Sequence, residues 1–199
     1  MPTYASPLVE VYLLDDHDIV RRGVRDLLVA ARDIQVVGES STTEGAAEAI
    51  LRLGASVMVL DVHLPDGTGI EVCRQVRAVD PSVSGLLLTS MDEDEALAAA
   101  ILAGASGSIL KASHGADIIG AVRRLGSGRS MIDSTMAARV RAQLRSRLAD
   151  LALGDDEHEV LSEVVDGQTD SEIAARHGTD LERTSGTVAS LVGRLTNRA

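Results

Sequence analysis

The sequence lacks Phe and Trp altogether and has only two tyrosines, Tyr4 and Tyr12, among its 199 residues. Binding of single-stranded nucleic acid by stacking bases on aromatic rings is therefore excluded as a main function. The core must be built from aliphatic side chains. Because Cys73 is the one cysteine, an internal disulfide and a cysteine-based metal site are excluded as well. We expect Cys73 to be a small buried residue.

Long apolar runs are also missing. No uninterrupted run approaches the roughly 18 to 20 residues that span a bilayer, and residues 1–7 lack the basic start and apolar stretch of a secretory signal. These features predict a soluble, cytoplasmic protein without a membrane partner. With 45% hydrophobic and 25% charged residues, the composition is typical of a folded globular chain.

Positive charge is scarce, and almost all of it is arginine. The net charge is −11, and Lys111 is the one lysine among 19 basic residues. Residues 150–199 contain 11 acidic and 4 basic residues, a net charge of −7. This acidic segment repels a phosphate-rich partner unless a local basic face is exposed.

Short apolar runs alternate with helical patterns from Leu8 onward. The runs of strand length cover residues 9–14, 34–37, 57–60, 86–88 and 108–110. Stretches of helical length lie between them, so the pattern predicts an α/β fold with five βα units. Such a fold has a parallel sheet covered on both faces, and ligands bind at the carboxyl ends of its strands.

The remainder of the chain is predicted to be helical. Residues 129–151 have the pattern of an amphipathic linker helix, with apolar residues spaced three and four apart: Met136, Val140, Leu144, Leu148 and Leu151. Two interpretations stay open for this helix: it packs onto its own domain, or it is a dimer-forming or signalling helix. Residues 155–165, 170–177 and 181–195 predict three short helices, which indicates a small all-α domain.

Reactive side chains follow four of the predicted strands. They are Asp15 and Asp16 after the first strand, Asp61 after the third, Thr89 and Ser90 after the fourth, and Lys111 after the fifth. Each of them alone is typical of a helix cap or a solvated strand end. Together they place three carboxylates, a hydroxyl and an ammonium group at one edge of the sheet.

This combination of groups predicts phosphoryl-transfer chemistry. Clustered carboxylates repel one another unless a divalent cation neutralises them, and oxygen ligands of this kind suit Mg²⁺. A carboxylate is able to attack a phosphoryl group and form an aspartyl phosphate. Asp61 is the best nucleophile candidate because it lies on the central strand, and Lys111 is its counter-charge.

Four segments carry a resemblance to a known family. They are LLDDH (residues 13–17), VLDVHLPDG (59–67), LTS (88–90) and GASGSILK (104–111). In order and spacing they resemble the receiver domain of two-component response regulators. Within that group the chain most resembles the NarL/FixJ branch, which has a LuxR-type helix-turn-helix. Residues 94–107 are similar to actinobacterial dormancy regulators of the DosR/DevR type.

The resemblance implies three parts: a flavodoxin-like, five-stranded receiver domain over residues 8–128, a linker helix over 129–151, and a divergent helix-turn-helix-like output domain over 152–199. It implies a cytoplasmic regulator of transcription, not an enzyme, that acts as a homodimer, binds DNA and is phosphorylated by a sensor histidine kinase. The implied site residues are Asp61 as phosphoacceptor, Thr89 and Lys111 on the phosphoryl group, and Asp15, Asp16, Asp61 and the His63 main-chain carbonyl on Mg²⁺.

Two positions depart from the family pattern. Ser108 stands where the family usually carries Tyr or Phe, so the relay from Thr89 to an aromatic ring is in doubt. Ser185 replaces a lysine of the recognition helix, and Gly186 weakens that helix by about 1 kcal/mol relative to alanine. The sequence also ends at Ala199, short of the fourth helix through which such domains often dimerise.

Two alternative functions remain open on these residues. In one, the acidic C-terminal domain binds protein rather than DNA. In the other, the chain is an aspartate-nucleophile phosphatase, because Asp16 and Asp18 satisfy the Asp-x-Asp pattern of such enzymes. The histidines at 17, 114, 158 and 177 share no ligand spacing, and we expect them at the surface or at helix caps.

Overall fold

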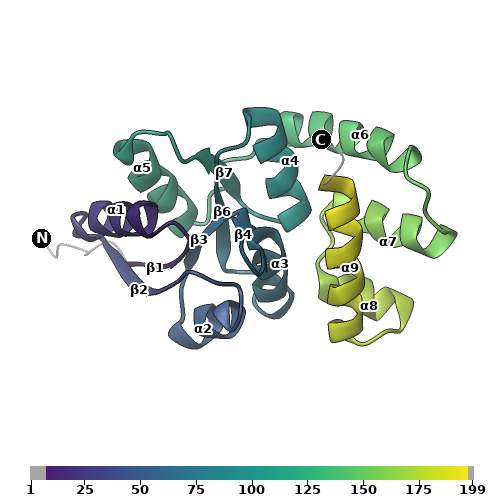
Figure 1. Ribbon diagram of the computed structural model, residues 1–199, viewed down its shortest axis with the longest axis horizontal. Helices are drawn as coiled ribbons and strands as arrows, with labels where there is room; N and C mark the ends of the chain where they lie inside the picture. Colours follow the sequence, from purple (N-terminus) through teal and green to yellow (C-terminus); the bar gives the residue numbers. More distant parts are fainter. Residues whose placement is uncertain (1–7, 197–199) are drawn as a thin grey trace, which may run out of the picture.

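The computed structural model describes residues 8–196 and contains a five-stranded parallel sheet (Figure 1). The strands are β1 (Val9–Leu14), β2 (Ile34–Ser40), β3 (Val57–Asp61), β6 (Ser84–Thr89) and β7 (Gly107–Leu110). Their order is β2-β1-β3-β6-β7, so the direction of winding reverses between β1 and β3. The predicted flavodoxin-like fold is confirmed, and each apolar run lies within its strand or overlaps it.

Helices cover both faces of this sheet. Its helices are α1 (Asp18–Val29), α2 (Ala46–Leu53), α3 (Gly69–Val79), α4 (Glu93–Ala103) and α5 (Gly115–Gly126). Leu28 of α1 and Val122 of α5 pack with Val11 and Val59 of the strands in one aliphatic core. The other strand residues, such as Met58, pack with α2, α3 and α4 in a second core. Two apolar layers therefore hold the strand ends in fixed positions.

A short hairpin that the sequence pattern did not predict follows β3. Strands β4 (His63–Leu64) and β5 (Gly67–Thr68) pair in antiparallel fashion, and Thr68 then caps α3. The first residue of α3, Gly69, lies so close to β3 that a Cβ atom there would be 2.1 Å from the Asp61 carbonyl oxygen. Glycine is therefore required at this position for the tight turn that fixes Asp61.

Four helices complete the described chain: α6 (Ser134–Ala149), α7 (Asp155–Asp166), α8 (Asp170–His177) and α9 (Leu181–Thr196). Gly178 adopts a left-handed backbone with φ of 63° and forms the turn between α8 and α9. Helix α9 continues without a break through Gly186, which is exposed to solvent. The helical prediction for this part is confirmed up to residue 196, and residues 197–199 lie outside the described part.

The linker helix α6 packs onto its own chain. Val140, Leu144 and Leu148 are buried, and α6 contacts both α4 of the receiver and α7. Met136, predicted on the same apolar side, is 41% exposed, whereas Ala137 beside it is 7% exposed. Within residues 8–196, no helix combines the length and the apolar character that a membrane span requires.

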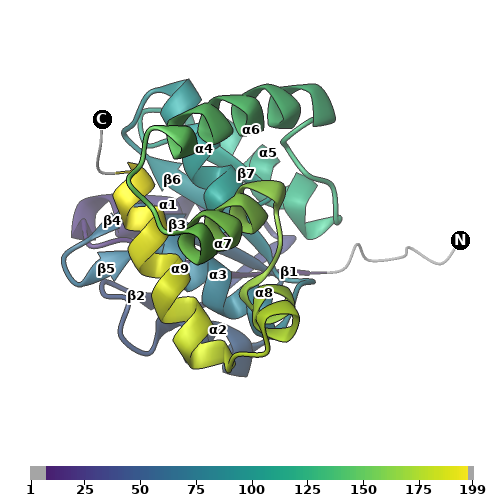
Figure 2. The same ribbon diagram turned by 90° about the vertical axis from the view of Figure 1, so that its right-hand side faces the viewer.

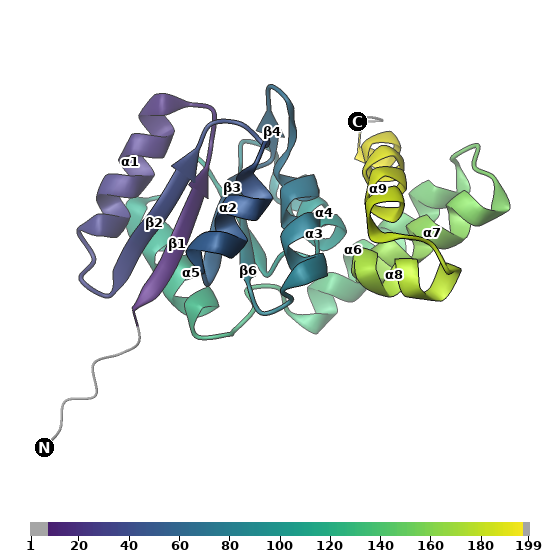
Figure 3. The same ribbon diagram turned by 90° about the horizontal axis from the view of Figure 1, so that it is seen from below.

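The helices α7 to α9 lie against the side of the receiver that carries α3 and α4 (Figures 2 and 3). The contact is centred on Arg74 of α3, which is 5% exposed and pairs with buried Asp170 of α8 at 2.6 Å. Arg74 also donates hydrogen bonds to the carbonyl oxygens of Leu102 and Gln168. The Ser185 hydroxyl of α9 donates to the second carboxylate oxygen of Asp170 at 2.8 Å.

Candidate metal and phosphoacceptor site

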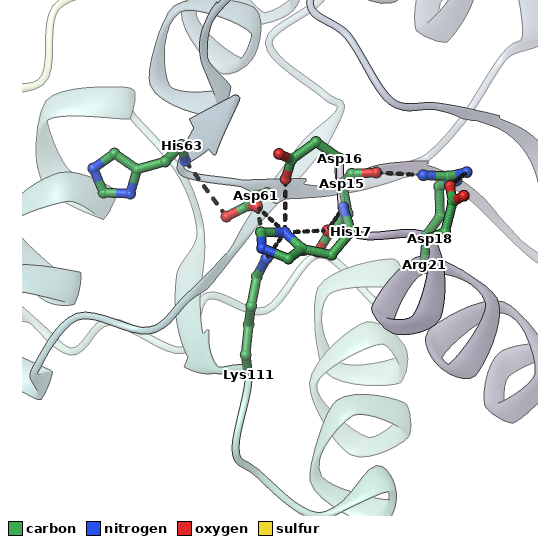
Figure 4. Close-up of polar contacts among 8 residues, drawn as sticks. All are labelled: Asp15, Asp16, His17, Asp18, Arg21, Asp61, His63 and Lys111. Carbon is green, nitrogen blue, oxygen red and sulfur yellow. Dashed lines mark hydrogen bonds and ion pairs between the residues drawn. The ribbon is translucent and has the colours of Figure 1, made fainter. Parts of the chain in front are cut away.

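The ends of three strands of the sheet, β1, β3 and β7, bring a lysine and two carboxylates into contact (Figure 4). Asp61 is the last residue of β3, whereas Asp15 and Lys111 directly follow β1 and β7. Lys111 Nζ lies 2.6 Å from Asp61 Oδ2 and 2.9 Å from Asp15 Oδ2. Residues that are 46 to 96 positions apart in the sequence thus meet at one edge, as parallel pairing of their strands requires.

Asp16 and His17 close this site on the solvent side. His17 Nδ1 lies 2.7 Å from Asp16 Oδ1, 3.3 Å from Asp15 Oδ1 and 3.6 Å from Asp61 Oδ2. We expected His17 at the surface or at a helix cap. It is the residue before α1, but its side chain makes no capping hydrogen bond there. The surface position is confirmed, since 62% of the side chain is exposed, and the ring faces the carboxylates.

Burial changes the pKa values of Asp61 and Lys111, the ion pair at the centre of the site. Desolvation raises the pKa of Asp61 above its ordinary value, while the hydrogen bond and the charge of Lys111 lower it and the charge of Asp15 raises it further. Burial alone lowers the pKa of Lys111, but its hydrogen bonds and charge interactions with Asp61 and Asp15 outweigh that effect and leave the pKa raised. Lys111 is therefore a firm positive charge beside the nucleophile candidate.

The donor set fits a divalent cation. The ligand atoms of Asp15, Asp16, His17 and Asp61 all lie within 4.8 Å of one another. Asp15 Oδ2 is buried, and it faces Lys111 Nζ at 2.9 Å. The three carboxylates outnumber the single lysine, so the site has an excess of negative charge that a cation would neutralise.

Thr89 and His63 lie at the same edge but make other contacts. The Thr89 side chain is buried, and its hydroxyl oxygen accepts a hydrogen bond from the Met91 backbone N–H at 3.0 Å. The His63 backbone N–H donates to Asp61 Oδ1 at 3.4 Å, and its imidazole points away from the carboxylates in Figure 4. The site residues that we predicted thus share one edge, and Thr89 makes no hydrogen bond to Asp61 among the described contacts.

Asp18 does not join the cluster. Its carboxylate pairs with Arg21 on the first turn of α1, and the side chain is 67% exposed. An aspartate-nucleophile phosphatase needs the second aspartate of its Asp-x-Asp pattern beside the first. In this chain the pattern is present in the sequence, but helix α1 carries Asp18 away from Asp16.

A hollow lies beside Ser108, where the family usually carries an aromatic ring. Its volume is about 320 Å³, and Leu97 of α4, Ile109 of β7 and two residues of the linker region, Met131 and Met136, line it. The Met131 backbone N–H donates to the Ser106 carbonyl, which fastens the linker to the start of β7. The linker thus lies next to the position of the missing ring.

Three of the six arginines of α6 and α9 form ion pairs within the described part of the chain. Arg139 and Arg145 of α6 pair with Asp94 and Asp166, and Arg194 of α9 pairs with Glu157. Arg183 makes no ion pair among residues 8–196. Sequence reasoning could not find these pairs, since their partners are distant in the chain.

Comparisons with known proteins agree with this geometry. The family model for the response regulator receiver domain matches residues 11–123. The DNA-binding transcriptional activator DevR/DosR of Mycobacterium tuberculosis is 43% identical over 176 residues, which cover 85% of this chain and 80% of that protein. The response regulator protein VraR of Staphylococcus aureus is 29% identical over 189 residues, which cover 94% of this chain and 90% of VraR.

Solved structures extend the likeness to both parts of the chain. A LuxR-family two-component response regulator from Aurantimonas matches with a TM-score of 0.60 and 29% identity, over 68% of this chain and 97% of that one. The RcsB response regulator of Salmonella typhimurium matches with a TM-score of 0.58 and 25% identity, over 96% of this chain and 93% of RcsB. From its motifs, its fold and these relatives, this chain belongs to the response regulator family and is a transcriptional regulator with an N-terminal receiver domain.

Proposed function

We propose that Asp61 accepts a phosphoryl group from the phosphohistidine of a sensor histidine kinase. The observation that supports this most is the contact of Asp61 with Lys111 at 2.6 Å, within a group of carboxylates that carries excess negative charge. A nucleophile must remain ionised and approach an anionic phosphoryl group. The lysine offsets the repulsion between the two, and the raised pKa of Asp61 strengthens the carboxylate as a base.

In the transfer, an Asp61 carboxylate oxygen forms a bond to phosphorus while the bond from phosphorus to the histidine nitrogen breaks. The nitrogen leaves with the electron pair. Asp15, Asp16, Asp61 and the His63 carbonyl would hold Mg²⁺, which neutralises charge on the phosphoryl oxygens when bound. Lys111 pairs with one of those oxygens, and the Thr89 hydroxyl turns from Met91 to donate a hydrogen bond to another.

The output of this modification is control of DNA binding by helices α7 to α9, in a homodimer. Ser185 stands where the recognition helix of the family usually carries lysine, and its hydroxyl is bound to Asp170, the partner of Arg74. The helix that would enter the DNA groove is thus tied to the receiver. Phosphorylation replaces the single negative charge of the Asp61 carboxylate with a phosphoryl group that carries about −1.5 to −2, and it shifts the equilibrium toward an arrangement in which α9 is released.

The acidic character of the C-terminal part favours a second candidate, in which this part binds protein. Its arginines are largely paired, as Arg176 is with Glu163 and Arg194 is with Glu157. Strong duplex binders typically make about six to ten phosphate contacts. DNA binding would need the linker arginines to leave their partners and add to Arg183.

The phosphoacceptor role is tested by treating the full chain with acetyl phosphate and Mg²⁺ and measuring its intact mass. We expect the wild type to gain one phosphoryl group, and Asp61→Asn or removal of Mg²⁺ with EDTA to prevent the gain. Asp18→Asn is the matched control, since Asp18 pairs outside the cluster. Labelling of Asp61→Asn to the wild-type extent would overturn the proposal.

The output is tested by gel shift with genomic DNA fragments, with and without phosphorylation. We expect retardation that phosphorylation strengthens and that weakens steeply with salt. No retardation in either state would remove the DNA-binding proposal and leave the protein-binding candidate.

A further inference from the structure

The imidazole of His17 has more charged neighbours than a single ring nitrogen is able to satisfy. Carboxylate oxygens of Asp16, Asp15 and Asp61 lie 2.7, 3.3 and 3.6 Å from its Nδ1 atom. Lys111 Nζ lies 3.3 Å from the same atom. Because Nδ1 carries at most one hydrogen, it donates to only one of these oxygens at a time.

A metal ion resolves this arrangement, because it takes several donors at once. Ligands that lie about 2.0–2.2 Å from a metal are roughly 3 to 3.5 Å from their neighbours in a tetrahedral or octahedral shell. The distances from Nδ1 to the carboxylate oxygens fall around that range. The nitrogen therefore lies where a ligand of the same ion would lie, and the buried Asp15 Oδ2, which faces Lys111 Nζ at 2.9 Å, offers a further oxygen.

A second group of carboxylates and histidine provides an internal comparison. Glu159, Glu163 and His177 also bring their ligand atoms within 4.8 Å. There, however, Arg176 donates to Glu163 Oε1 at 2.6 Å and already balances its charge. Around His17 the three carboxylates share one lysine, so charge balance favours a cation at His17 and not at His177.

We propose that His17 Nδ1 is a ligand of the same metal ion that Asp15, Asp16 and Asp61 bind. This proposal rests on the metal site of the proposed function. The consequence is a change in metal selectivity. Mg²⁺ prefers oxygen ligands in a strict octahedron, whereas imidazole suits later first-row ions, and affinity for a mixed site rises from Mn²⁺ onward. The site selects Mn²⁺ or a later divalent ion over Mg²⁺ more strongly than an all-oxygen site does.

The test measures metal binding directly, on the full chain and without phosphorylation. Mn²⁺ is titrated into the wild type, His17→Gln and His158→Gln, and the free ion is followed by electron paramagnetic resonance. Pulsed measurements on the bound ion then detect coupling to ¹⁴N. His158 is exposed on α7, outside the site, so its variant is the matched control.

We expect ¹⁴N coupling in the wild type and in His158→Gln but not in His17→Gln. His17→Gln is also expected to lose about tenfold or more in Mn²⁺ affinity, since loss of even an outer partner of a metal ligand typically costs about 10- to 100-fold. Competition with Mg²⁺ is expected to show that His17→Gln loses less affinity for Mg²⁺ than for Mn²⁺. A melting curve checks that the variant is folded. Because 62% of the His17 side chain is exposed, the substitution removes little packing.

Two results would overturn the proposal. One is bound Mn²⁺ without ¹⁴N coupling in the wild type. The other is an Mn²⁺ affinity of His17→Gln that equals or exceeds that of the wild type. Such a result would mean that the ion does not bind the imidazole and pushes it aside. Labelling of Asp61 by acetyl phosphate with Mg²⁺ separates the two proposals. If labelling persists, only the ligand role of His17 fails; if labelling is absent, the phosphoacceptor function fails.

Discussion

Two buried charge clusters of this chain are built in opposite ways. At the Arg74–Asp170 contact, one guanidinium faces one carboxylate, and carbonyls and the Ser185 hydroxyl complete their hydrogen bonds. At the phosphoacceptor edge, Lys111 contacts Asp61 and Asp15, and a third carboxylate, Asp16, faces His17 instead of a lysine or arginine. The first cluster is complete and holds two parts of the chain together. The second lacks positive charge, which is what a site that takes up a cation and an anionic phosphoryl group requires.

The largest effect is expected when Arg74, the cation of the complete cluster, is replaced. Arg74→Met leaves Asp170 buried without a counter-charge, and we expect a loss of about 3–5 kcal/mol in the free energy that holds the C-terminal helices in place. Urea denaturation followed by circular dichroism measures it. The double variant Arg74→Met with Asp170→Leu is expected to recover much of the loss. No recovery would show that the pair does not act as a unit.

Lys111→Ala is expected to have the next largest effect, about 1–3 kcal/mol of destabilisation, because it leaves two buried carboxylates without their cation. The pKa of Lys111 is raised in the folded state. Its contribution is therefore fully present below the ordinary lysine pKa and is lost as the pH rises through the raised value. Denaturation of the wild type and Lys111→Ala from neutral to alkaline pH should show that the difference between their free energies of unfolding shrinks at the alkaline end. A constant difference would contradict the account.

Asp61→Asn is expected to act in the opposite direction and to stabilise the fold at neutral pH. Burial raises the pKa of Asp61, so its ionised form costs free energy in the folded chain. That cost is absent below the ordinary aspartate pKa and appears as the pH rises through the raised folded value. A gain of about 1 kcal/mol corresponds to roughly 2–4 °C in Tm for a chain of this size. Melting curves at neutral and acidic pH should show a gain that disappears on acidification; a gain that persists there would refute this cause.

The smallest effect is expected at the surface pair of Arg139 and Asp94, whose side chains are 60% and 67% exposed. Arg139→Gln should change the free energy of unfolding by less than about 1 kcal/mol, because solvent screens the pair. The same urea titration measures it at low and high salt. A loss as large as that of Arg74→Met would show that burial does not distinguish these contacts.

Much of the receiver could be predicted from the sequence because its signals are local. Each apolar run of strand length became a parallel strand, and parallel strands necessarily gather Asp15, Asp61 and Lys111 at one edge. The hairpin β4–β5 was missed, since two-residue strands leave no apolar period. His17 lies at the surface and directly before α1, as we expected, but the direction of its ring toward the carboxylates was not predicted. Its ring direction depends on where α1 begins and on the distant Lys111, and no local pattern records either.

The contact between the two parts was harder to predict for the same reason. Arg74 lies in a helix whose polar residues look solvated in sequence, and its partner Asp170 lies 96 positions away. The loss of a lysine at Ser185 was visible as a departure from the family pattern. Its consequence, a hydrogen bond from the Ser185 hydroxyl to Asp170, depends on how α9 packs against α8, which no local sequence pattern records.

The measurement that tests the central claim most directly is the location of the phosphoryl group. After treatment with acetyl phosphate and Mg²⁺, reduction with borohydride converts an aspartyl phosphate to homoserine, which peptide mass spectrometry assigns to a residue. The account predicts one labelled residue, Asp61. Label on Asp15 or Asp16, or no converted aspartate at all, would contradict it.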